Sequence, residues 1–522
     1  MKKFLLAGLS LSFIVACNSS KQSASQPEIA KQAASPETYA GTITEQELKE
    51  MLYVYASDEF EGRNTGTAGE KKAVEYLSNY YTDNDIPAAQ SGGKYAQNVP
   101  LVSQKVPEAS VNINGKTYNI GEHFATFSAP ESKTYTYNEI VFAGYGIEDE
   151  KYSDYTHVNV SGKPVLIKGG EPRKEDGTYV ISGTTETSKW SNLRQAIGDK
   201  IKLAKEKGAS GVIFYDATAF PFIIQQFNYM KNQGRGGMTL KEEQEHFFFL
   251  FINEDMANEL HKDLDKLSAP KTISTTARIT FESKSEEITS KNVVAWIKGS
   301  EKPEEYVIVS AHLDHVGVDA SGNVYNGADD DGSGTVAILE IAEAFKKAQS
   351  EGNGPKRSVV FLHVTGEEKG LLGSDYYTRN PVFPLENTVA DLNIDMIGRT
   401  DPDREGDKNY VYIIGSDKLS SELHTLSEEI NTKYGGLVLD YKFNDENDPN
   451  RFYYRSDHYN FAKNNVPIIF YFSGTHEDYH KVTDTPDKIN YDLLARRTKL
   501  IFHTAWELAN RENRIVVDKA SE

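Results

Sequence analysis

From Ser290 to the C-terminus, short apolar runs alternate with longer segments of helical periodicity, and this alternation strongly restricts the possible fold. We predict buried strands over residues 306–310, 358–364, 389–397 and 466–472, and helices over residues 334–349, 419–434 and 491–513. Strands that alternate with helices form a mostly parallel sheet that is covered on both faces. We therefore expect an α/β domain with a mostly parallel central sheet.

Five short polar segments lie in this half of the chain, and most of them directly follow a predicted strand. His312 ends the first strand, Glu367 and Glu368 follow the second, and Asp395 closes the third. The other two segments are the loop 327–334, with the run Asp329-Asp330-Asp331, and the stretch Asp478-Tyr479-His480. Because ligands of open α/β sheets bind beyond the carboxyl ends of the strands, we expect these side chains to gather in one cleft.

The residue types in these segments are those that divalent metal ions bind. Imidazole and carboxylate groups are zinc ligands, and a site for two metal ions needs one carboxylate that binds both. Asp330, the middle acid of three, is the candidate for that shared ligand. Of the two adjacent glutamates, one can bind metal while the other takes a proton from water. Tyr479 is a candidate hydrogen-bond donor to a developing oxyanion.

Three further polar residues near these strands have different interpretations. Asp314, two residues after His312, is a candidate to accept the hydrogen of the second imidazole nitrogen and so to fix the tautomer. His315 ranks below His312 as a ligand, because in an extended stretch its side chain points the other way. His363 alternates into a strand, and we interpret it as a core histidine.

Residues 130–280 contain none of the five segments and have a different pattern. Short strands bounded by glycine are predicted over 140–146, 164–169 and 211–215, a helix is predicted over 193–207, and the aromatic run 246–251 is typical of core packing. We predict that residues 130–280 form an inserted domain. The main domain would then comprise residues 43–129 and 281–515.

The N-terminus has the pattern of an export signal. Lys2 and Lys3 precede an apolar run that is too short to span a bilayer, and Ala16 stands before Cys17, the single cysteine of the chain. This pattern resembles the lipobox of bacterial lipoproteins; an ordinary signal peptide is the alternative. We expect residues 1–16 to be the signal peptide and residues 17–42 a flexible linker, with a lipid on Cys17 anchoring an exported protein on the periplasmic side or the cell surface.

The charge of the chain limits the class of partner. There are 77 acidic and 57 basic residues, which gives a net charge of −20. A chain of this composition has no evident basic stripe for the phosphates of a nucleic acid, so we expect none as a partner. The cysteine count also excludes disulfides and a thiolate metal site within the folded domains.

The five segments resemble one known family. Ala-His-Leu-Asp-His, Asn-Gly-Ala-Asp-Asp-Asp-Gly-Ser-Gly, Thr-Gly-Glu-Glu-Lys-Gly-Leu-Leu-Gly-Ser, Asn-Ile-Asp-Met-Ile-Gly and Tyr-His-Lys-Val-Thr-Asp-Thr-Pro-Asp-Lys-Ile resemble motifs of the di-zinc aminopeptidases, a family that includes glutamate carboxypeptidases and glutaminyl cyclases. Residues 57–63 resemble the N-terminal segment of its members. Residues 142–147 resemble the protease-associated domain that is inserted in many of them.

The resemblance implies a specific assignment of the site. One zinc ion would be held by His312, Asp330 and Asp395, and a second by Asp330, Glu368 and His480. Glu367 would be the general base, Asp314 the partner of His312, and the peptide bond after Asp330 would often be cis in this family.

The resemblance also implies a function. The expected activity is that of a zinc-dependent aminopeptidase, which removes N-terminal residues from peptides through a hydroxide that bridges two zinc ions. The alternatives are a carboxypeptidase, for which Arg399, Arg451 and Arg455 lie in suitable loops, a glutaminyl cyclase with a single zinc ion, and a receptor-like relative without catalysis.

Overall fold

The computed structural model describes residues 35–519, except residues 130, 233–235, 242–246 and 268. The predicted signal peptide, Cys17 and most of the predicted linker lie outside these residues. The linker was expected to reach residue 42, but helix α1 (Pro36–Ala40) already begins at Pro36, and Tyr39 is fully buried. Within the described ranges, no helix is both long and apolar enough to cross a membrane.

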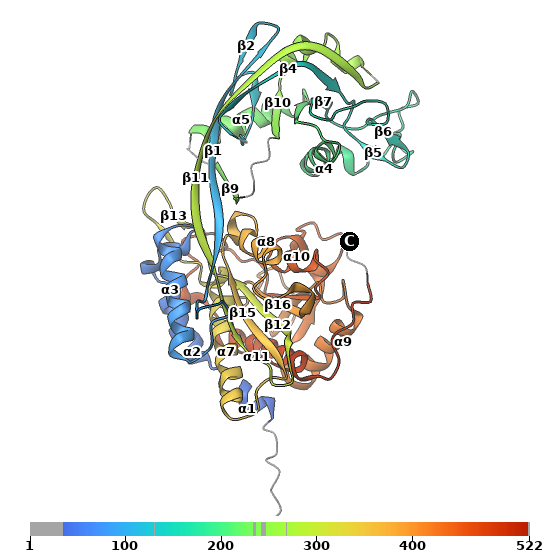
Figure 1. Cartoon of the computed structure of the whole chain (residues 1–522). Helices are drawn as coiled ribbons and strands as arrows, with labels where there is room; N and C mark the ends of the chain where they lie inside the picture. The colour runs from blue at the N-terminus through green and yellow to red at the C-terminus, as the bar shows by residue number, and fades with distance from the viewer. Residues whose placement is uncertain (1–34, 130, 233–235, 242–246, 268, 520–522) are drawn as a thin grey trace, which may run out of the picture. The chain divides into compact units, whose positions relative to one another are not determined.

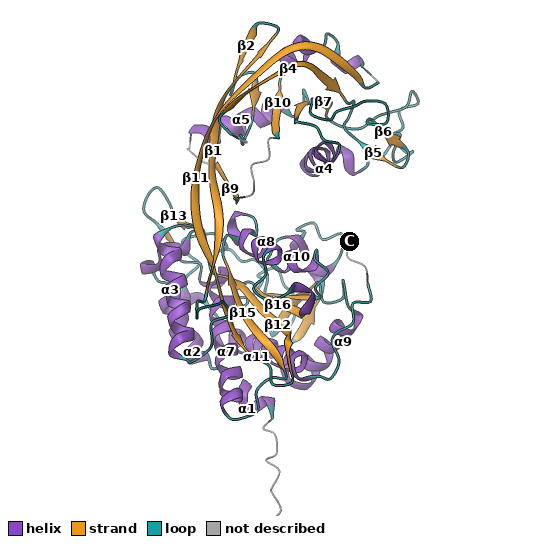
Figure 2. Ribbon diagram, viewed as in Figure 1, coloured by secondary structure: helices purple, strands orange, loops and turns teal. Residues whose placement is uncertain are grey.

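The central sheet confirms the predicted α/β class. Its strands follow the order β18-β17-β19-β16-β12-β15-β11. Figures 1 and 2 label β16, β12, β15 and β11 of this sheet. The middle four strands are parallel, whereas β17 and β11 run antiparallel to their neighbours β19 and β15. The bounds are β11 Lys271–Ile297, β12 Lys302–His312, β15 Arg357–Val364, β16 Thr388–Ile394, β17 Tyr410–Ile414, β18 Val438–Asp440 and β19 Ile468–Phe472.

Helices cover both faces of this sheet, as Figure 2 shows. On one face lie α7 (Gly334–Ser350) and α11 (Tyr491–Asn510), and Phe345 of α7 packs on Phe361 of β15. On the other face lie α8 (Leu372–Arg379) and α10 (His458–Ala462), whose Phe461 shares a core cluster with Leu362. Successive residues of β15 thus point into opposite cores, which explains why this strand is continuously apolar.

The N-terminal helices pack beside the C-terminal half of the chain. Helices α2 (Glu45–Tyr55) and α3 (Ala68–Asp83), drawn in blue in Figure 1, flank a short 3₁₀ turn, and α2 contacts α7 and α11. Helix α9 (Ser421–Ile430) continues into a π turn (Asn431–Gly435), so the helix predicted over 419–434 is regular only in its first part.

A second group of strands contains the predicted inserted block. Strands β4 (Lys133–Phe142), β7 (Pro164–Lys168), β8 (Gly211–Tyr215) and β10 (Phe248–Ile252) are parallel neighbours, and β3 (Phe124–Ala125) ends the row. In β10, Phe248 and Leu250 join one core cluster while Phe249 and Phe251 belong to another. The aromatic run is therefore core packing on both faces of a strand, as the sequence indicated. Helices α4 (Leu193–Glu206), α5 (Phe220–Asn232) and α6 (Glu254–Leu260) accompany these strands.

Two long strands join the two groups. Strand β1 (Ala96–Ile113) pairs with β11 antiparallel from the pair Ala96–Val293 to the pair Ile113–Ala277, with one irregularity between Lys105 and Glu108. The boundary predicted between residues 280 and 281 lies inside β11. The remaining short strands are β2 (Lys116–Asn119), β5 (Glu148–Asp149), β6 (Tyr152–Ser153), β9 (Gly236–Leu240), β13 (Gly317–Val318) and β14 (Val324–Tyr325).

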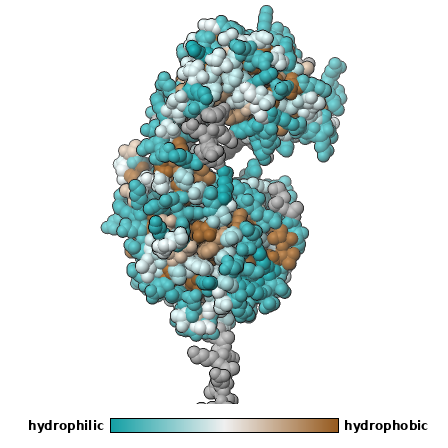
Figure 3. Space-filling model, viewed as in Figure 1, coloured by the Kyte–Doolittle hydropathy of each residue, from teal (hydrophilic) through white to brown (hydrophobic). Residues whose placement is uncertain are grey.

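The surface agrees with the acidic composition. On the face drawn in Figure 3 most of the described residues are hydrophilic or neutral, and the hydrophobic ones form small separate groups. The large apolar side chains are mostly in the cores, with a few exposed exceptions such as Phe222 and Tyr229 on α5.

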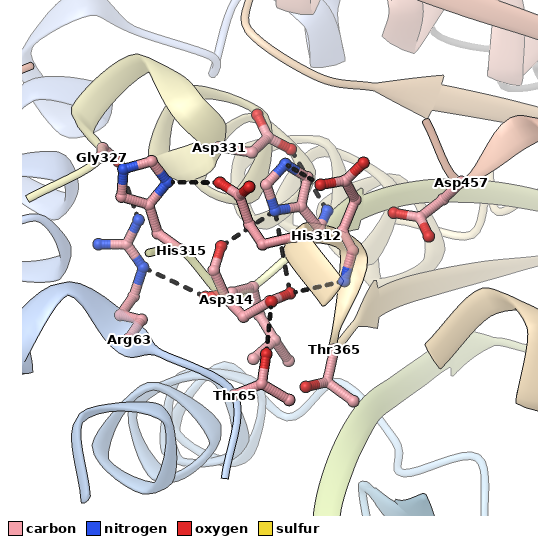
Figure 4. A network of polar contacts seen from close by, with 12 residues as sticks. Arg63, Thr65, His312, Asp314, His315, Gly327, Asp331, Thr365 and Asp457 are labelled. Atoms are coloured by element: carbon pink, nitrogen blue, oxygen red, sulfur yellow. Dashed lines mark hydrogen bonds and ion pairs between the residues drawn. The ribbon is translucent and has the colours of Figure 1, made fainter. Parts of the chain in front are cut away.

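Arg63 connects the N-terminal segment to the loops at the sheet edge (Figure 4). This fully buried guanidinium donates hydrogen bonds to the backbone carbonyl oxygens of Tyr55 (3.2 Å), Leu313 (3.2 Å), Asn326 (2.7 Å) and Gly327 (2.9 Å). It also lies over the ring of Tyr55 at 4.6 Å. One side chain therefore satisfies carbonyl groups from three separate segments.

Replacing Arg63 by methionine should destabilise the fold. The carbonyl oxygens of Tyr55 and Asn326 would lose this donor, and those of Leu313 and Gly327 would each lose one of two donors. We therefore expect the free energy of unfolding to fall by about 2–4 kcal/mol. The matched control is Arg496→Met, because Arg496 on α11 is 51% exposed and its partners are the side chains of Asp492, one turn away, and Asn409. The control should change stability by less than about 0.5 kcal/mol. Urea unfolding measures both, and equal effects would contradict the role of Arg63.

Candidate metal centre

The topology of the sheet brings the polar segments to one edge. Strand β12 lies between β15 and β16, and all three run parallel, with Val309 beside both Phe361 and Leu392. Their carboxyl ends therefore meet, which places His312, Glu367 and Asp395 together. The loop 327–334 leads into α7 at the same edge, and the segment 478–480 follows β19, the neighbour of β16.

Asp330 lies between two groups of possible metal ligands. Its Oδ1 atom is 3.2 Å from Nε2 of His312, and that nitrogen is also 3.7 Å from Oδ1 of Asp395. Its Oδ2 atom is 3.0 Å from Nε2 of His480, which lies 3.1 Å from Oε2 of Glu368. The two oxygens of one carboxylate thus face two different sets of donors, the arrangement that a bridging ligand needs.

The second group contains an additional histidine. His315 is fully buried, with Nδ1 2.9 Å from Oε1 of Glu368 and 3.7 Å from Oδ2 of Asp330. The sequence argument ranked it lower because it assumed an extended backbone. Strand β12 ends at His312, however, and His315 forms an isolated bridge with Asn64, so strict alternation no longer applies there.

The residues present fit a divalent metal ion. His312, Asp331 and Asp395 form one group of potential ligand atoms, and His315, Asp330 and Glu368 form another. Four ligands placed tetrahedrally around zinc stand about 3.3 Å apart, which is close to the separations seen here. Among the described residues, five polar atoms of the cluster are buried without a hydrogen-bond partner: Nε2 of His312, Oδ2 of Asp330, Oε1 of Glu368 and both ring nitrogens of His315. Such atoms are costly unless a cation or a water satisfies them.

Asp331 has a different task from that of Asp330. Its carboxylate accepts hydrogen bonds from the backbone N–H groups of His312 (3.3 Å), Gly334 (2.9 Å) and Met396 (3.1 Å). Those three groups belong to β12, to the first residue of α7 and to the segment after β16. Asp331 therefore holds three ligand-bearing segments in register. The peptide bond between Asp330 and Asp331 is cis, as the resemblance implied.

Asp329 and Asp484 fix the same loop from the other side. The backbone N–H groups of Asp329 and Asp330 donate to the carboxylate of Asp484 (3.1 and 3.2 Å). Oδ1 of Asp329 accepts from the backbone of Gly398 (2.6 Å), and its Oδ2 is 3.2 Å from Nε2 of the buried His476. Only the middle acid of the three is left to face the metal cluster with both oxygens.

Asp314 differs in one respect from the expected role. Nδ1 of His312 lies 3.0 Å from the backbone carbonyl oxygen of Asp314 and 4.0 Å from its carboxylate. A carbonyl oxygen only accepts, so Nδ1 carries the hydrogen, and the lone pair of Nε2 faces Asp330 and Asp395. The carboxylate of Asp314 instead accepts the hydroxyl of Thr65 (2.8 Å) and the backbone N–H of Glu367 (3.1 Å; Figure 4).

The two adjacent glutamates have opposite electrostatic environments. Burial raises the pKa of Glu367 well above its usual range; the charge of His312 opposes this shift, while those of Glu368 and Asp395 add to it. Burial and Asp330 also raise the pKa of Glu368, but the nearby imidazoles of His315 and His480 outweigh them and bring it to about 2. Glu368 is therefore the more readily ionised of the two and is suited to bind a metal ion, whereas the Glu367 carboxyl holds a proton more readily.

Tyr479 and a set of apolar residues complete the pocket beside the cluster. The ring of Tyr479 stacks on that of His480, with centroids 4.0 Å apart. The pocket contains the acids Asp330, Glu367 and Asp395, and its other walls are formed by Met396, Phe452, Arg455, Phe470, Phe472, Thr475 and Tyr479. Sequence reasoning had identified Tyr479 but not the apolar wall, because the wall comes from strands and loops far apart in the sequence.

Asp457 is a buried carboxylate near the cluster that the sequence reasoning did not identify. Burial raises the pKa of Asp457 to about 7, and the charge of His312 opposes that shift. The hydroxyl of Ser374 donates to its Oδ1 (2.5 Å), while Oδ2 has no hydrogen-bond partner among the described residues. Figure 4 shows Asp457 beside the cluster. The one cue in the sequence is an acid between two polar residues in an otherwise aromatic segment.

Comparisons with known proteins agree with this site. Residues 292–505 match the profile of peptidase family M28. A probable zinc metalloprotease of Pyrenophora teres f. teres is 27% identical over 263 residues, which cover 42% of this chain and 52% of that protein. A probable leucine aminopeptidase of Trichophyton verrucosum is 29% identical over 229 residues, which cover 42% of this chain and 57% of that protein. The chain thus spans about half the length of the curated relatives it matches.

One solved structure extends the similarity of the fold. An aminopeptidase from Aneurinibacillus sp. strain AM-1 covers 93% of this chain and 98% of its own, with a TM-score of 0.51 and 18% sequence identity. That likeness shows a shared fold over most of the described residues. Residues 292–505, which contain all five motifs, match the model of peptidase family M28, and over this segment the chain is identified as similar to that family.

Proposed function

We propose that this protein is a zinc-dependent aminopeptidase that removes N-terminal residues from peptides and uses two zinc ions. The observation that carries the proposal is the position of Asp330, whose two oxygens face His312 and Asp395 on one side and Glu368 and His480 on the other. The chain's similarity to a probable zinc metalloprotease and to a probable leucine aminopeptidase supports the proposal.

The ligand sets follow from these contacts. His312, Asp330 and Asp395 would hold one zinc ion, while Asp330, Glu368 and His480 would hold the other, with His315 as a further donor beside the second. Bound zinc supplies a water of lowered pKa and polarises the substrate carbonyl. The buried, unpartnered nitrogen and oxygen atoms of the cluster are the atoms that these ions would satisfy.

The remaining steps belong to residues of the chain. Glu367 takes a proton from the attacking water and returns it to the leaving amine, because its carboxyl lines the pocket beside Asp330 and Asp395. Asp314 orients this base by accepting its backbone N–H, and Thr65 holds Asp314. Tyr479 lines the pocket beside Glu367, where its hydroxyl is a candidate donor to the oxyanion.

The alternatives within the family are less well supported. A single-zinc cyclase does not need a carboxylate shared between two donor groups, which Asp330 provides here. A receptor-like relative needs neither a base nor a complete ligand set, and both are present. Of the three arginines considered for a carboxypeptidase, Arg399 is paired with Asp478 at 3.1 Å, so its charge is already engaged, whereas Arg455 lines the pocket.

Replacing Glu367 by glutamine tests the assignment of the base. The variant keeps the shape of the side chain but cannot accept a proton, so we expect kcat to fall by roughly 10²–10⁴-fold while the zinc content stays near that of the wild type. The matched control is Glu368→Gln, which should lower the zinc content as well as the activity. Assays with aminoacyl chromogenic substrates and metal analysis measure both, and retained activity in Glu367→Gln would contradict the role of the base.

Removing the metal should reduce stability as well as activity. Without cations, Asp330, Glu368 and Asp395 repel one another in a buried site. Zinc that is present at about 1,000 times its Kd stabilises the fold by about 4 kcal/mol per site. We expect chelation to lower the thermal midpoint, and zinc add-back to restore it with two ions bound per chain. A plateau at one ion would favour the single-zinc alternative.

We also propose that the protein is a lipid-anchored exported protein, on the basis of the residues before and after Cys17. The change Cys17→Ser removes the only thiol that could carry a lipid. In a bacterial host that processes lipoproteins, we expect this variant to lose incorporation of labelled palmitate and to leave the membrane fraction. A variant that stays in the membrane fraction would contradict the anchor.

A further inference from the structure

Arg455 is a positively charged side chain in a pocket whose other walls are acidic, polar or apolar. Asp330, Glu367 and Asp395 lie on the side of the metal cluster, and Met396, Phe470 and Phe472 belong to the apolar wall. A side-chain cation beside the residues that would perform hydrolysis has no place in the mechanism described above. It is therefore available for the substrate.

The position of Arg455 is set by stacking. Arg455 follows the 3₁₀ turn Phe452–Tyr454 and donates its backbone N–H to the carbonyl oxygen of Phe452 (3.0 Å). Its guanidinium lies over the ring of Phe452, 4.9 Å from the centroid. Packing of a guanidinium on an aromatic face limits its rotation but leaves its N–H groups free.

The Arg455 guanidinium carries no ion pair in the part of the chain that the structure describes, although acids are abundant nearby. Those acids are committed elsewhere. Asp330 faces His312 and His480, Asp395 faces His312, and Asp457 accepts the hydroxyl of Ser374. The contrast is Arg399, which is 3.1 Å from Asp478. An arginine left unpaired beside a reaction site is suited to bind an anionic group that arrives with the substrate.

We propose that Arg455 binds a carboxylate of the substrate next to the scissile bond and makes the site selective for substrates that have one. This inference rests on the proposed peptidase function and names its substrate class. Two sources supply the same chemistry: the acidic side chain of the N-terminal residue, or the terminal carboxylate of a dipeptide. The planar guanidinium can form two parallel hydrogen bonds with either.

The apolar wall is compatible with this chemistry. Met396, Phe470 and Phe472 can contact the methylene groups of a glutamate side chain, while the guanidinium binds its end. When the ligand carboxylates are offset by two divalent cations, their charge no longer repels a second anion in the pocket. The carboxylate would then meet one free cation and little net negative charge.

The experiment uses the zinc-loaded full-length protein and compares two pairs of substrates. Glutamyl- and leucyl-p-nitroanilide differ in the side-chain carboxylate, and Leu-Leu and Leu-Leu-amide differ in the terminal one. The variants are Arg455→Met, which keeps an unbranched stem for packing on Phe452, and Arg455→Lys, which keeps the charge. The matched control is Arg451→Met, because Arg451 is also exposed and stacked on an aromatic ring (Tyr454, 4.7 Å) but does not line the pocket.

In Arg455→Met we expect kcat/KM for one carboxylate-bearing substrate to fall by roughly 10- to 100-fold relative to its neutral partner. A fall in the glutamyl-to-leucyl ratio identifies the side chain as the source, and a fall in the dipeptide-to-amide ratio identifies the terminus. Arg455→Lys should recover part of the loss. If both ratios are unchanged, or if Arg451→Met lowers them equally, the inference is overturned.

A binding measurement separates this inference from the proposed function. Calorimetry with L-glutamate and L-leucine on the same proteins needs no turnover. If the wild type hydrolyses none of the substrates but binds glutamate more tightly than leucine, and Arg455→Met removes the difference, the recognition role stands while the peptidase proposal fails. If there is no turnover and no such difference, both are overturned.

Discussion

The central constraint on this structure is the burial of several carboxylates within a few ångströms of one another. Asp314, Asp330 and Asp331 are at most 3% exposed, and Asp395 is 8% exposed. An unpaired buried charge costs several kcal/mol, and adjacent like charges add to that cost. Two features of the chain offset it: backbone N–H groups converge on Asp331, and imidazoles face Asp330 and Glu368. The lone pairs left over are suited to bind cations.

This constraint also explains how chemically identical neighbours acquire different roles. Asp329, Asp330 and Asp331 are consecutive, but the outer two accept backbone hydrogen bonds from loops of the site, and only Asp330 faces the ligand groups on both sides. Glu367 and Glu368 separate in the same manner, because the imidazoles of His315 and His480 reach only the second. Function is thus assigned by which partners the backbone brings near each side chain, and a separation of one residue is sufficient.

Much of the fold and the site could be predicted from the sequence, because both leave local patterns. The apolar runs before His312, Glu367 and Asp395 predicted strands, and the strand ends predicted where the ligands gather. What could not be predicted depends on contacts between distant segments. The sequence did not show that His315 follows the end of its strand. It did not show that the Asp314 carboxylate contacts Thr65 and Glu367, or that the Asp314 carbonyl oxygen contacts His312. Nor did it show that Arg455 borders the same pocket as Glu367. The sequence did not predict the long pairing of β1 with β11 either, because polar residues interrupt the alternation of apolar and polar side chains on both strands.

That pairing has a consequence for how the chain folds. Strand β11 belongs to both groups of strands, and its partner β1 lies far away in the sequence, with the inserted block between them. Closing a long flexible segment lowers chain entropy before any contact compensates, and such non-local pairing slows folding. If the inserted block folds first, it brings Ile113 near Ala277 and replaces a long open loop by a short effective one. In that order of events, the predicted insertion nucleates the register of the β1–β11 pair, and with it the sheet that carries the candidate ligands.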